Sequence, residues 1–168
     1  MSKPIELNDV DPGPPLVYKR RIGWNDSDTA RIANTARFID FAMTAVESWY
    51  RHVWGRDWHA MHLDLDMGSP CVHAEIDFQS PLEPGDLLGI TVRVERMRES
   101  SLTFALDGRR HDGTPCFRAR YVTTLVAMQP RMHAVPIPPS QRARIETYMA
   151  GCSTGETAGT ARAPDRTG

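Results

Sequence analysis

Residues 35–54 carry a hydrophobic pattern that narrows the folds open to this chain. Polar side chains recur every three or four positions there, so on a helix they form one narrow stripe. The stripe consists of Arg37, Asp40, Thr44, Glu47, Ser48 and Arg51. A surface helix usually buries one stripe and exposes the rest, whereas this helix would bury most of its circumference. We therefore expect a helix about 30 Å long that other elements enclose.

The ends of this helix are also marked in the sequence. Asn34 is a favourable N-cap and Gly55 a favourable C-cap. Glu47 and Arg51 are spaced to pair across one turn. Charges recur along the whole segment, which excludes a membrane span.

Strands are predicted on both sides of the helix. Residues 16–24 suit a first strand, and residues 69–80, 87–97, 101–110 and 114–128 suit four more. The last four are joined by short turns, which makes them antiparallel neighbours. The expected class is α+β, with a curved antiparallel β-sheet wrapped around one long central helix. One sheet leaves an edge unpaired, so we expect a homodimer or homotetramer.

The rest of the chain divides into simpler segments. Residues 1–15 are polar and proline-rich, and we expect a flexible N-terminal arm. Residues 16–150 form the single predicted domain, ending in a short helix at 140–150. Residues 55–68 are a connector with a short helical turn. Residues 151–168 lack large apolar groups and should be a disordered tail.

Charge and cysteine content exclude several classes of partner. The chain has 20 Lys and Arg against 21 Asp and Glu, so nothing indicates binding to nucleic acid or to a membrane. Its three cysteines have no metal-ligand spacing, and their odd number suits a reducing compartment. The N-terminus has no signal-peptide pattern. We expect a cytoplasmic protein without a metal or other cofactor.

Two motifs resemble one known family. The first runs from Trp24 through Asp26 and Asp28, with the aromatic Phe38 following Asp28 by ten residues. The second is the turn Ser80-Pro81-Leu82-Glu83-Pro84-Gly85-Asp86. Together with the order of elements, over residues 17–128, they resemble the hotdog-fold 4-hydroxybenzoyl-CoA thioesterases and related acyl-CoA thioesterases.

The resemblance implies an enzyme that hydrolyses an acyl-CoA or aroyl-CoA. Asp28 matches the catalytic carboxylate of the family, and Thr35 matches the position whose backbone N–H faces the thioester carbonyl. Phe38 would pack near the acyl group. Arg98 falls where the family often places a basic residue for the CoA phosphates.

The chain departs from the family pattern at two places. Arg31 stands where the family usually has glycine in the turn after Asp28. The neighbours of Arg98 are Met97 and Glu99, whereas the family often has basic residues there. Arg96, Arg109, Arg110 or the partner subunit are therefore alternative holders of the CoA phosphates.

The chemistry of thioester hydrolysis leads to the same residues. The reaction needs a carboxylate that attacks the carbonyl or activates water, and a donor for the developing oxyanion. Asp28 lies shortly before a helix N-terminus, where backbone N–H groups are unpaired and an ionised carboxylate is favoured. The sequence does not separate nucleophile from general base. Asp26 is expected to accept loop N–H bonds in a structural role.

Other interpretations of the same residues stay open. The acidic loop could merely cap the helix, since such loops are common. Glu47 is a rival catalytic carboxylate on the helix. His59, His62 and Asp64 have a spacing that could hold a metal.

Two alternative functions also stay open. His73 with a carboxylate would suit a hotdog hydratase or dehydratase acting on acyl thioesters. Arg31 in place of glycine, and the lack of basic neighbours beside Arg98, would suit a non-catalytic acyl-CoA binding module. Met43, Met61 and Met67 fit core packing as well as a pocket lining.

Overall fold

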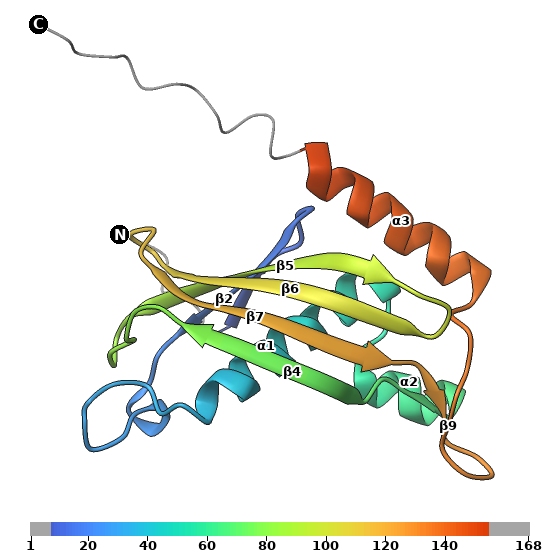
Figure 1. Cartoon of the computed structure of the whole chain (residues 1–168), viewed down its shortest axis with the longest axis horizontal. Helices are drawn as coiled ribbons and strands as arrows, with labels where there is room; N and C mark the ends of the chain where they lie inside the picture. Colours follow the sequence, from blue (N-terminus) through green and yellow to red (C-terminus); the bar gives the residue numbers. More distant parts are fainter. Residues whose placement is uncertain (1–7, 155–168) are drawn as a thin grey trace, which may run out of the picture.

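The computed structural model describes residues 8–154. Its elements are β1 (Asn8–Asp11), β2 (Leu16–Arg21), η1 (Trp24–Asp26), α1 (Arg37–Trp49), η2 (Tyr50–Trp54), α2 (Trp58–Leu65), β3 (Met67–Gly68), β4 (Cys71–Phe78), β5 (Leu87–Met97), β6 (Ser101–Arg110), β7 (Pro115–Thr124), β8 (Val126–Ala127), β9 (His133–Ala134) and α3 (Pro139–Thr154). A six-stranded antiparallel sheet has the order β1-β2-β5-β6-β7-β4, and a small sheet has the order β3-β8-β9 (Figure 1).

The central helix runs the length of the sheet. α1 continues without a break into the π-helical turn η2, and Gly55 ends it with φ 92°. The expected C-cap at Gly55 is confirmed. The expected N-cap at Asn34 is wrong: Ala36 holds that position without a side-chain cap bond, and Asn34 Oδ1 accepts the Ala36 N–H at 2.9 Å in the turn before the helix. The expected pairing of Glu47 with Arg51 is wrong: Arg51 instead donates to Asp57, the N-cap of α2, at 3.2 Å.

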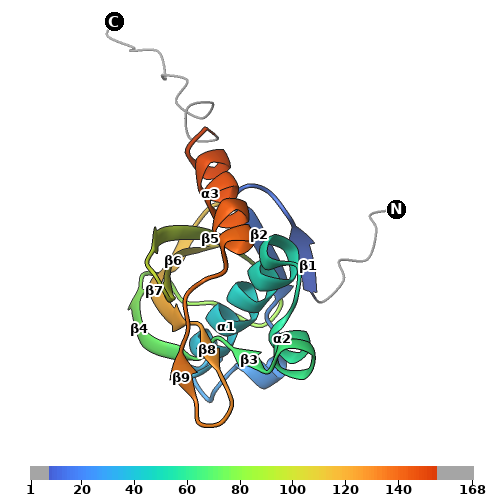
Figure 2. The same cartoon turned by 90° about the vertical axis from the view of Figure 1, so that its right-hand side faces the viewer.

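The large sheet curves around α1, as Figure 2 shows. Alternate residues of β5 and β6 point inward and are buried, which is the period-two pattern expected of them. At the far end of the core, the Trp49 ring lies 4.9 Å from Phe104 and 5.9 Å from Tyr148 of α3. The Tyr148 hydroxyl donates to the Val92 carbonyl and accepts the Leu16 N–H at 2.9 Å. The predicted α+β class, a curved sheet around one long helix, is confirmed.

Several boundaries differ from those expected. Residues 8–11, placed in the N-terminal arm, form β1 and pair with β2. The connector holds the eight-residue helix α2 rather than a turn. The last strand divides into β7 and β8, and β8 leaves the large sheet to pair with β3 and β9. α3 continues to Thr154. The rest of the expected arm (1–7) and tail (155–168) lies outside the described residues.

The edge strand β4 is exposed on both faces. Val72 and Phe78 are 60% and 53% exposed although both are apolar. On α1, Ile39 and Met43 are 38% and 37% exposed. Within residues 8–154 no strand pairs with the outer edge of β4. Apolar side chains therefore lie uncovered along this edge of the sheet.

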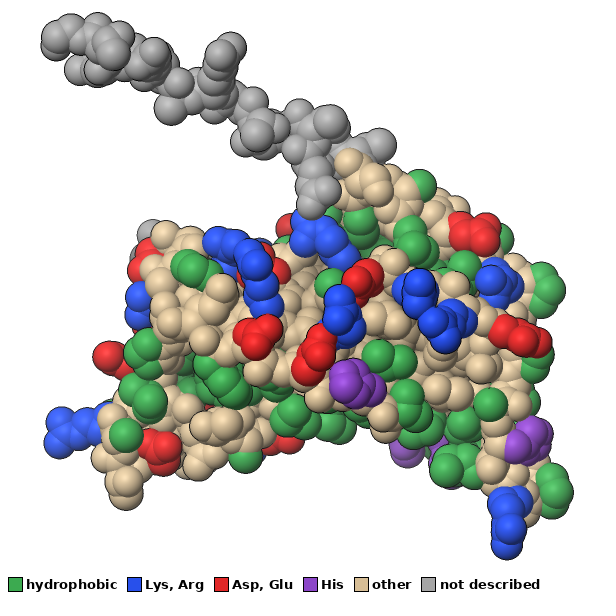
Figure 3. Space-filling view, viewed as in Figure 1, with side chains coloured by type: hydrophobic (Ala, Val, Ile, Leu, Met, Phe, Trp, Pro, Cys, Tyr) green, Lys and Arg blue, Asp and Glu red, His purple; other side chains and the backbone are tan. Residues whose placement is uncertain are grey.

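The outer face of the sheet is polar. Arg120 makes a two-bonded contact with Glu95 at 2.9 and 3.0 Å and contacts Glu75 at 2.8 Å. Figure 3 shows cationic and anionic side chains mixed over this face. Such exposed pairs contribute little to stability, so the apolar inner face supplies the core.

Candidate active site

Asp26 anchors the loop between β2 and α1. Its side chain is nearly inaccessible, and its two oxygens face four donors. Oδ2 accepts from the Gly23 N–H at 2.9 Å and from Arg20 at 2.7 Å, while Oδ1 accepts from Arg37 Nε and Nη2 at 3.1 and 2.9 Å. Burial raises the pKa of Asp26, but the Gly23 N–H and the two guanidinium groups outweigh it and hold that pKa below its ordinary value. The expected structural role of Asp26 agrees with this geometry.

Asp28 sits at the exposed tip of the same loop. Its Oδ1 accepts the Ala30 N–H at 2.8 Å, and its backbone N–H donates to the Ile32 carbonyl at 3.0 Å. Arg31 donates its backbone N–H to the Asp28 carbonyl at 3.0 Å. Arg31 has φ 62°, a left-handed conformation that favours glycine. The tight turn therefore forms without the glycine, at the cost of backbone strain.

The two sequence motifs meet in space. Ala33, which lies between Asp28 and Phe38 of the first motif, donates its N–H to the carbonyl of Leu82, from the second motif, at 2.7 Å. Leu82 is fully buried. The second motif is also joined to the end of β2, since Ile22 donates to the Asp86 carbonyl at 2.9 Å and accepts from Gly85 at 2.8 Å. These contacts fix the Asp28 loop against the rigid end of the sheet.

A cavity of about 390 Å³ opens at the start of α1. It is lined by Ile32, Ala33, Thr35, Phe38, Phe78, Gln79, Ser80 and Pro81. The Phe38 ring lies 5.0 Å from the Phe78 ring, edge to face. The Thr35 backbone N–H has no hydrogen-bond partner within residues 8–154. We call this the Thr35 cavity.

The structure brings together some of the predicted site residues. Thr35 and Phe38 line one cavity, and Asp28 stands on the loop that leads into it. Arg98 lies elsewhere. It directly follows the last residue of β5, whereas the second motif ends directly before the first residue of β5. At about 3.3 Å per residue, an 11-residue strand separates those ends by roughly 35 Å. Arg98 is therefore remote from Asp28 of its own chain.

The rival residues occupy other environments. Glu47 lies on α1 outside the Thr35 cavity. His73 lies 3.6 Å from Glu75, and both side chains are exposed on β4. Asp64 pairs with Arg56. No cluster of three or more potential metal ligands occurs in the part of the chain that the structure describes.

A second cavity near β4 was not predicted as a site. It measures about 370 Å³ and is lined by Met43, Trp58, His62, Met67, Gly68, Ser69, Pro70, Cys71, Tyr121, Met128 and Met132. We call it the methionine pocket. Met43 and Met67, whose sequence context fits core packing as well as a pocket, line this cavity, whereas Met61 is fully buried in the core. No sequence pattern indicated that Met128 and Met132 line this pocket. They reach it only because the β8–β9 hairpin folds back against the rest of the lining.

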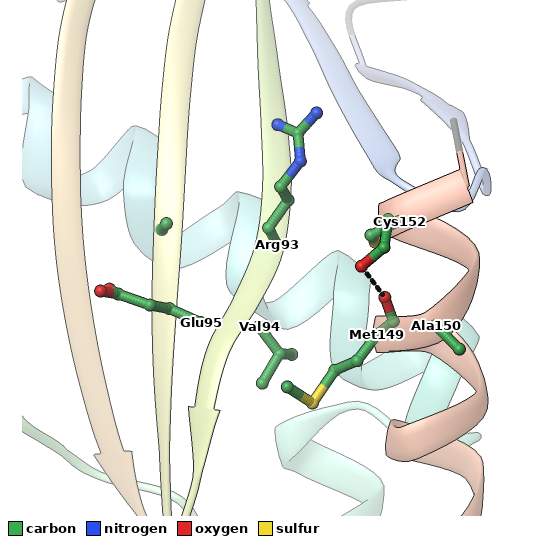
Figure 4. A pocket seen from close by; sticks show the side chains of 8 residues that line it. Arg93, Val94, Glu95, Met149, Ala150 and Cys152 are labelled. Carbon is green, nitrogen blue, oxygen red and sulfur yellow. Dashed lines mark hydrogen bonds between the residues drawn. The ribbon is translucent and has the colours of Figure 1, made fainter. Parts of the chain in front are cut away.

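A further cleft of about 440 Å³ lies between β5 and α3 (Figure 4). Arg93, Val94, Glu95, Met149, Ala150 and Cys152 line it, with Ala105 and Ser153. None of the predicted site residues borders this cleft.

The curved sheet around one helix, with an acidic loop at the helix start, defines a hotdog-fold protein. The chain matches the thioesterase-like superfamily over residues 22–145 and belongs to that family. It is 26% identical over 117 residues to a 1,4-dihydroxy-2-naphthoyl-CoA hydrolase from Crocosphaera subtropica, covering 70% of this chain and 85% of that protein.

Solved structures agree with this assignment. A thioesterase-superfamily protein from Jannaschia sp. CCS1 superposes with a TM-score of 0.71 at 33% identity, over 78% of this chain and 90% of that one. The 4-hydroxybenzoyl-CoA thioesterase of Pseudomonas sp. strain CBS-3 has the same fold, with a TM-score of 0.70 at 18% identity, over 76% and 96%. The predicted family, fold and enzyme class, a thioesterase, are confirmed. No described helix is long and apolar enough to cross a membrane.

Proposed function

We propose that Asp28 and the Thr35 backbone N–H carry out the hydrolysis of an aroyl- or acyl-CoA to the free acid and CoA. The observation that carries this proposal is the Thr35 N–H, which lies in the turn just before α1, lines a cavity and lacks a partner within residues 8–154. Such a donor polarises a carbonyl and stabilises the oxyanion that develops on it. Asp28 is the exposed carboxylate on the adjoining loop.

Two reaction courses fit this arrangement. As a nucleophile, Asp28 attacks the thioester carbon and expels CoA thiolate, leaving a mixed anhydride that water then hydrolyses. As a general base, Asp28 takes a proton from water, whose oxygen attacks the same carbon and expels the thiolate. In both courses the Thr35 N–H holds the carbonyl oxygen.

An aromatic acyl group is the preferred substrate class. Phe38 and Phe78 line the Thr35 cavity with their rings edge to face, and an aromatic acyl group packs favourably against such rings in an offset or edge-to-face geometry. The related proteins named above act, by their names, on naphthoyl-CoA and hydroxybenzoyl-CoA, which supports the same class here. We assign the activity to the cytoplasm, in keeping with the free cysteines within residues 8–154.

The active form is proposed to be a homodimer joined through β4. A two-fold axis through the middle of β4 pairs the strand with its copy in antiparallel orientation and extends the sheet. The copy then covers Val72, Phe78, Ile39 and Met43, which are exposed in one chain. A homotetramer would pair two such dimers.

The proposed dimer also explains how Arg98, which is remote from Asp28 of its own chain, could contact bound CoA. Cys71 at the start of β4 pairs with Thr123, and Ser101, next to the Arg98 turn, pairs with Thr124. Arg98 and Cys71 therefore lie at the same end of the sheet. The antiparallel pairing brings this end toward the Phe78 end of the partner, so Arg98 would help to hold the CoA phosphates of the partner's site.

The test is CoA release from a panel of benzoyl-, hydroxybenzoyl-, naphthoyl- and straight-chain acyl-CoAs. Wild type is compared with Asp28→Asn and with Glu47→Gln, the matched change at the rival carboxylate. We expect turnover of aroyl-CoA in wild type and Glu47→Gln, and a loss of 100-fold or more, on the order expected for a catalytic acid or base, in Asp28→Asn. Turnover retained in Asp28→Asn would refute the assignment of Asp28. Acyl-CoA binding without any CoA release would refute the enzyme.

A further inference from the structure

A hollow on the outer face of the large sheet lies over Gly89 of β5. It measures about 410 Å³ and is lined mainly by residues of β1, β2, β5 and β6. Leu88 and Ile90, the neighbours of Gly89, are buried in the core, so Gly89 faces outward. Figure 1 looks onto this face, with α1 behind the sheet. We call this the Gly89 hollow, and it shares no lining residue with the Thr35 cavity.

The strand register places a cation on each side of Gly89. Gly89 is paired with Lys19 of β2 and, on its other side, with Arg109 of β6. Neighbouring strands lie about 4.8 Å apart, so the Cα atoms of Lys19 and Arg109 are separated by roughly 10 Å. Both side chains line the hollow. Because Gly89 has no side chain, no β5 side chain stands between the two cations in this row.

The backbone of β5 does not require glycine at this position. The pairing of β5 with β2 and with β6 continues through Gly89 without a register shift, and its φ is not positive. A Cβ added there would lie 3.5 Å from Val17 Cγ1 and 3.9 Å from the Arg109 carbonyl oxygen, which are ordinary contacts. Glycine weakens the interior of a strand, and it often marks a place where a ligand approaches closely. What glycine leaves open here is the hollow itself.

The two flanking cations keep donors free for an anion. The Lys19 side chain has no hydrogen bond or ion pair within residues 8–154. Arg109 Nε donates to Asp107 at 2.9 Å and its Nη1 donates to the Gly113 carbonyl at 3.3 Å, which fixes the guanidinium group. Its Nη2 has no partner in the described part of the chain. Asp9 is the one acidic residue among the described residues that line the hollow.

The remaining lining indicates the rest of the ligand. Arg110 also borders the hollow, but its charge is met by Asp86 and Asp112. Val17 and Leu87 contribute apolar surface. A phosphate group accepts charge-assisted hydrogen bonds from both lysine and arginine. The volume lies within the range of roughly 300–1,000 Å³ that small-molecule sites occupy, which leaves room for a larger group attached to the phosphate.

We propose that the Gly89 hollow binds a phosphate monoester that carries an aromatic group, of which a nucleoside monophosphate is the simplest example. The phosphate lies over Gly89 between Lys19 and Arg109, and the aromatic group lies against Val17 and Leu87. This site is separate from the thioester site and does not depend on the proposed function. Since CoA also carries phosphates, the experiments distinguish a free nucleotide from the CoA of the substrate.

The first test is isothermal titration calorimetry with adenosine monophosphate, adenosine and inorganic phosphate. We expect wild type to bind adenosine monophosphate at least 10-fold more tightly than either fragment, because each fragment lacks one half of the contacts. Lys19→Ala and Arg109→Ala should each weaken this binding by about 10-fold, the loss expected for one charge-assisted contact. Arg118→Ala removes an exposed cation of β7 that does not line the hollow, and it should bind like wild type. Equal affinities in wild type, Lys19→Ala and Arg109→Ala would overturn the proposal.

The second test fills the hollow and measures catalysis beside binding. Gly89→Val adds a side chain that suits a strand, and it should abolish binding of adenosine monophosphate while circular dichroism shows a folded protein. A folded Gly89→Val that binds the nucleotide like wild type would overturn the site. In CoA-release assays, Lys19→Ala should keep the wild-type KM for an aroyl-CoA. A KM raised 10-fold would instead show that the hollow holds the phosphates of the substrate, which would overturn a separate site.

Discussion

Arg37, the first residue of α1, donates two hydrogen bonds to Oδ1 of Asp26, at 3.1 and 2.9 Å. The other oxygen of Asp26 accepts from Arg20 of β2 at 2.7 Å. One buried carboxylate therefore joins the sheet, the acidic loop and the central helix. The loop that presents Asp28 owes its position to this contact.

Asp26→Asn should destabilise the protein by about 2–3 kcal/mol, somewhat less than for a fully buried pair because Arg37 is partly exposed. The change leaves Arg20 and Arg37 without their shared anion. Urea unfolding measures the effect. Asp40→Asn is the matched control: Asp40 also pairs with Arg37, but it is exposed, so its loss should cost less than about 0.5 kcal/mol. Equal losses in the two variants would contradict the anchoring role of Asp26.

Asp26 also predicts a pH dependence of stability. Its pKa is lowered in the folded state, so the unfolded chain binds its proton first as the pH falls. The stabilisation is complete above the unfolded pKa, about 3.9, and is lost as the pH falls through the lower folded value. The free energy of unfolding of wild type and Asp26→Asn should therefore converge below pH 4. Parallel curves from pH 6 to pH 2 would contradict this linkage.

Thr35→Pro should lower kcat by about 100- to 1000-fold, because proline removes the N–H proposed to bind the oxyanion. Proline is tolerated at the start of a helix, so the fold should persist. Thr35→Ala keeps the N–H and should retain most of the activity. Steady-state kinetics with an aroyl-CoA, beside circular dichroism, measures both variants. Similar kcat values for the two would remove the N–H from the mechanism.

Arg31→Gly should stabilise the protein by about 0.5–1 kcal/mol, because glycine adopts φ 62° without strain. This gain allows for the greater freedom of glycine in the unfolded chain. Arg31→Ala removes the same side chain and keeps the strain, so it should not stabilise. A difference in melting temperature of about 2 °C or more between the variants is expected. If alanine stabilised as much as glycine, the side chain and not the backbone would be responsible.

Ala74→Lys should dissociate the proposed dimer. Ala74 lies near the middle of the exposed strand β4, so a two-fold axis there would bring two lysines together, and like charges repel. Sedimentation velocity should show a shift to monomer and a parallel loss of CoA release. Thr103→Lys, on β6 away from this edge, should leave the assembly unchanged. A dimeric Ala74→Lys would place the interface elsewhere.

The local hydrophobic periodicity of the sequence predicted most of the helices and strands. The alternation in residues 87–97 and 101–110 predicted β5 and β6 with both ends correct, because each strand buries one face and so alternates by two. The helical period of residues 35–54 predicted α1 and η2 with Gly55 at the C-terminal end, whereas the helix starts at Arg37 with Ala36 and not Asn34 as its N-cap. The spacing of Asp28 and Phe38 identified the loop and the family that the comparisons then confirmed.

The tertiary structure decided which residues distant in sequence contact one another. The bond from Ala33 to Leu82 joins residues 49 positions apart. Arg51 pairs with Asp57, the N-cap of α2, and not with Glu47. The methionine pocket forms only when α1, α2, β3 and the β8–β9 hairpin converge. Periodicity reports which face of an element is buried, and it does not report which distant element covers that face. The sequence by itself therefore determined the helix, the strands and the acidic loop, whereas the fold decided which side chains share a cavity.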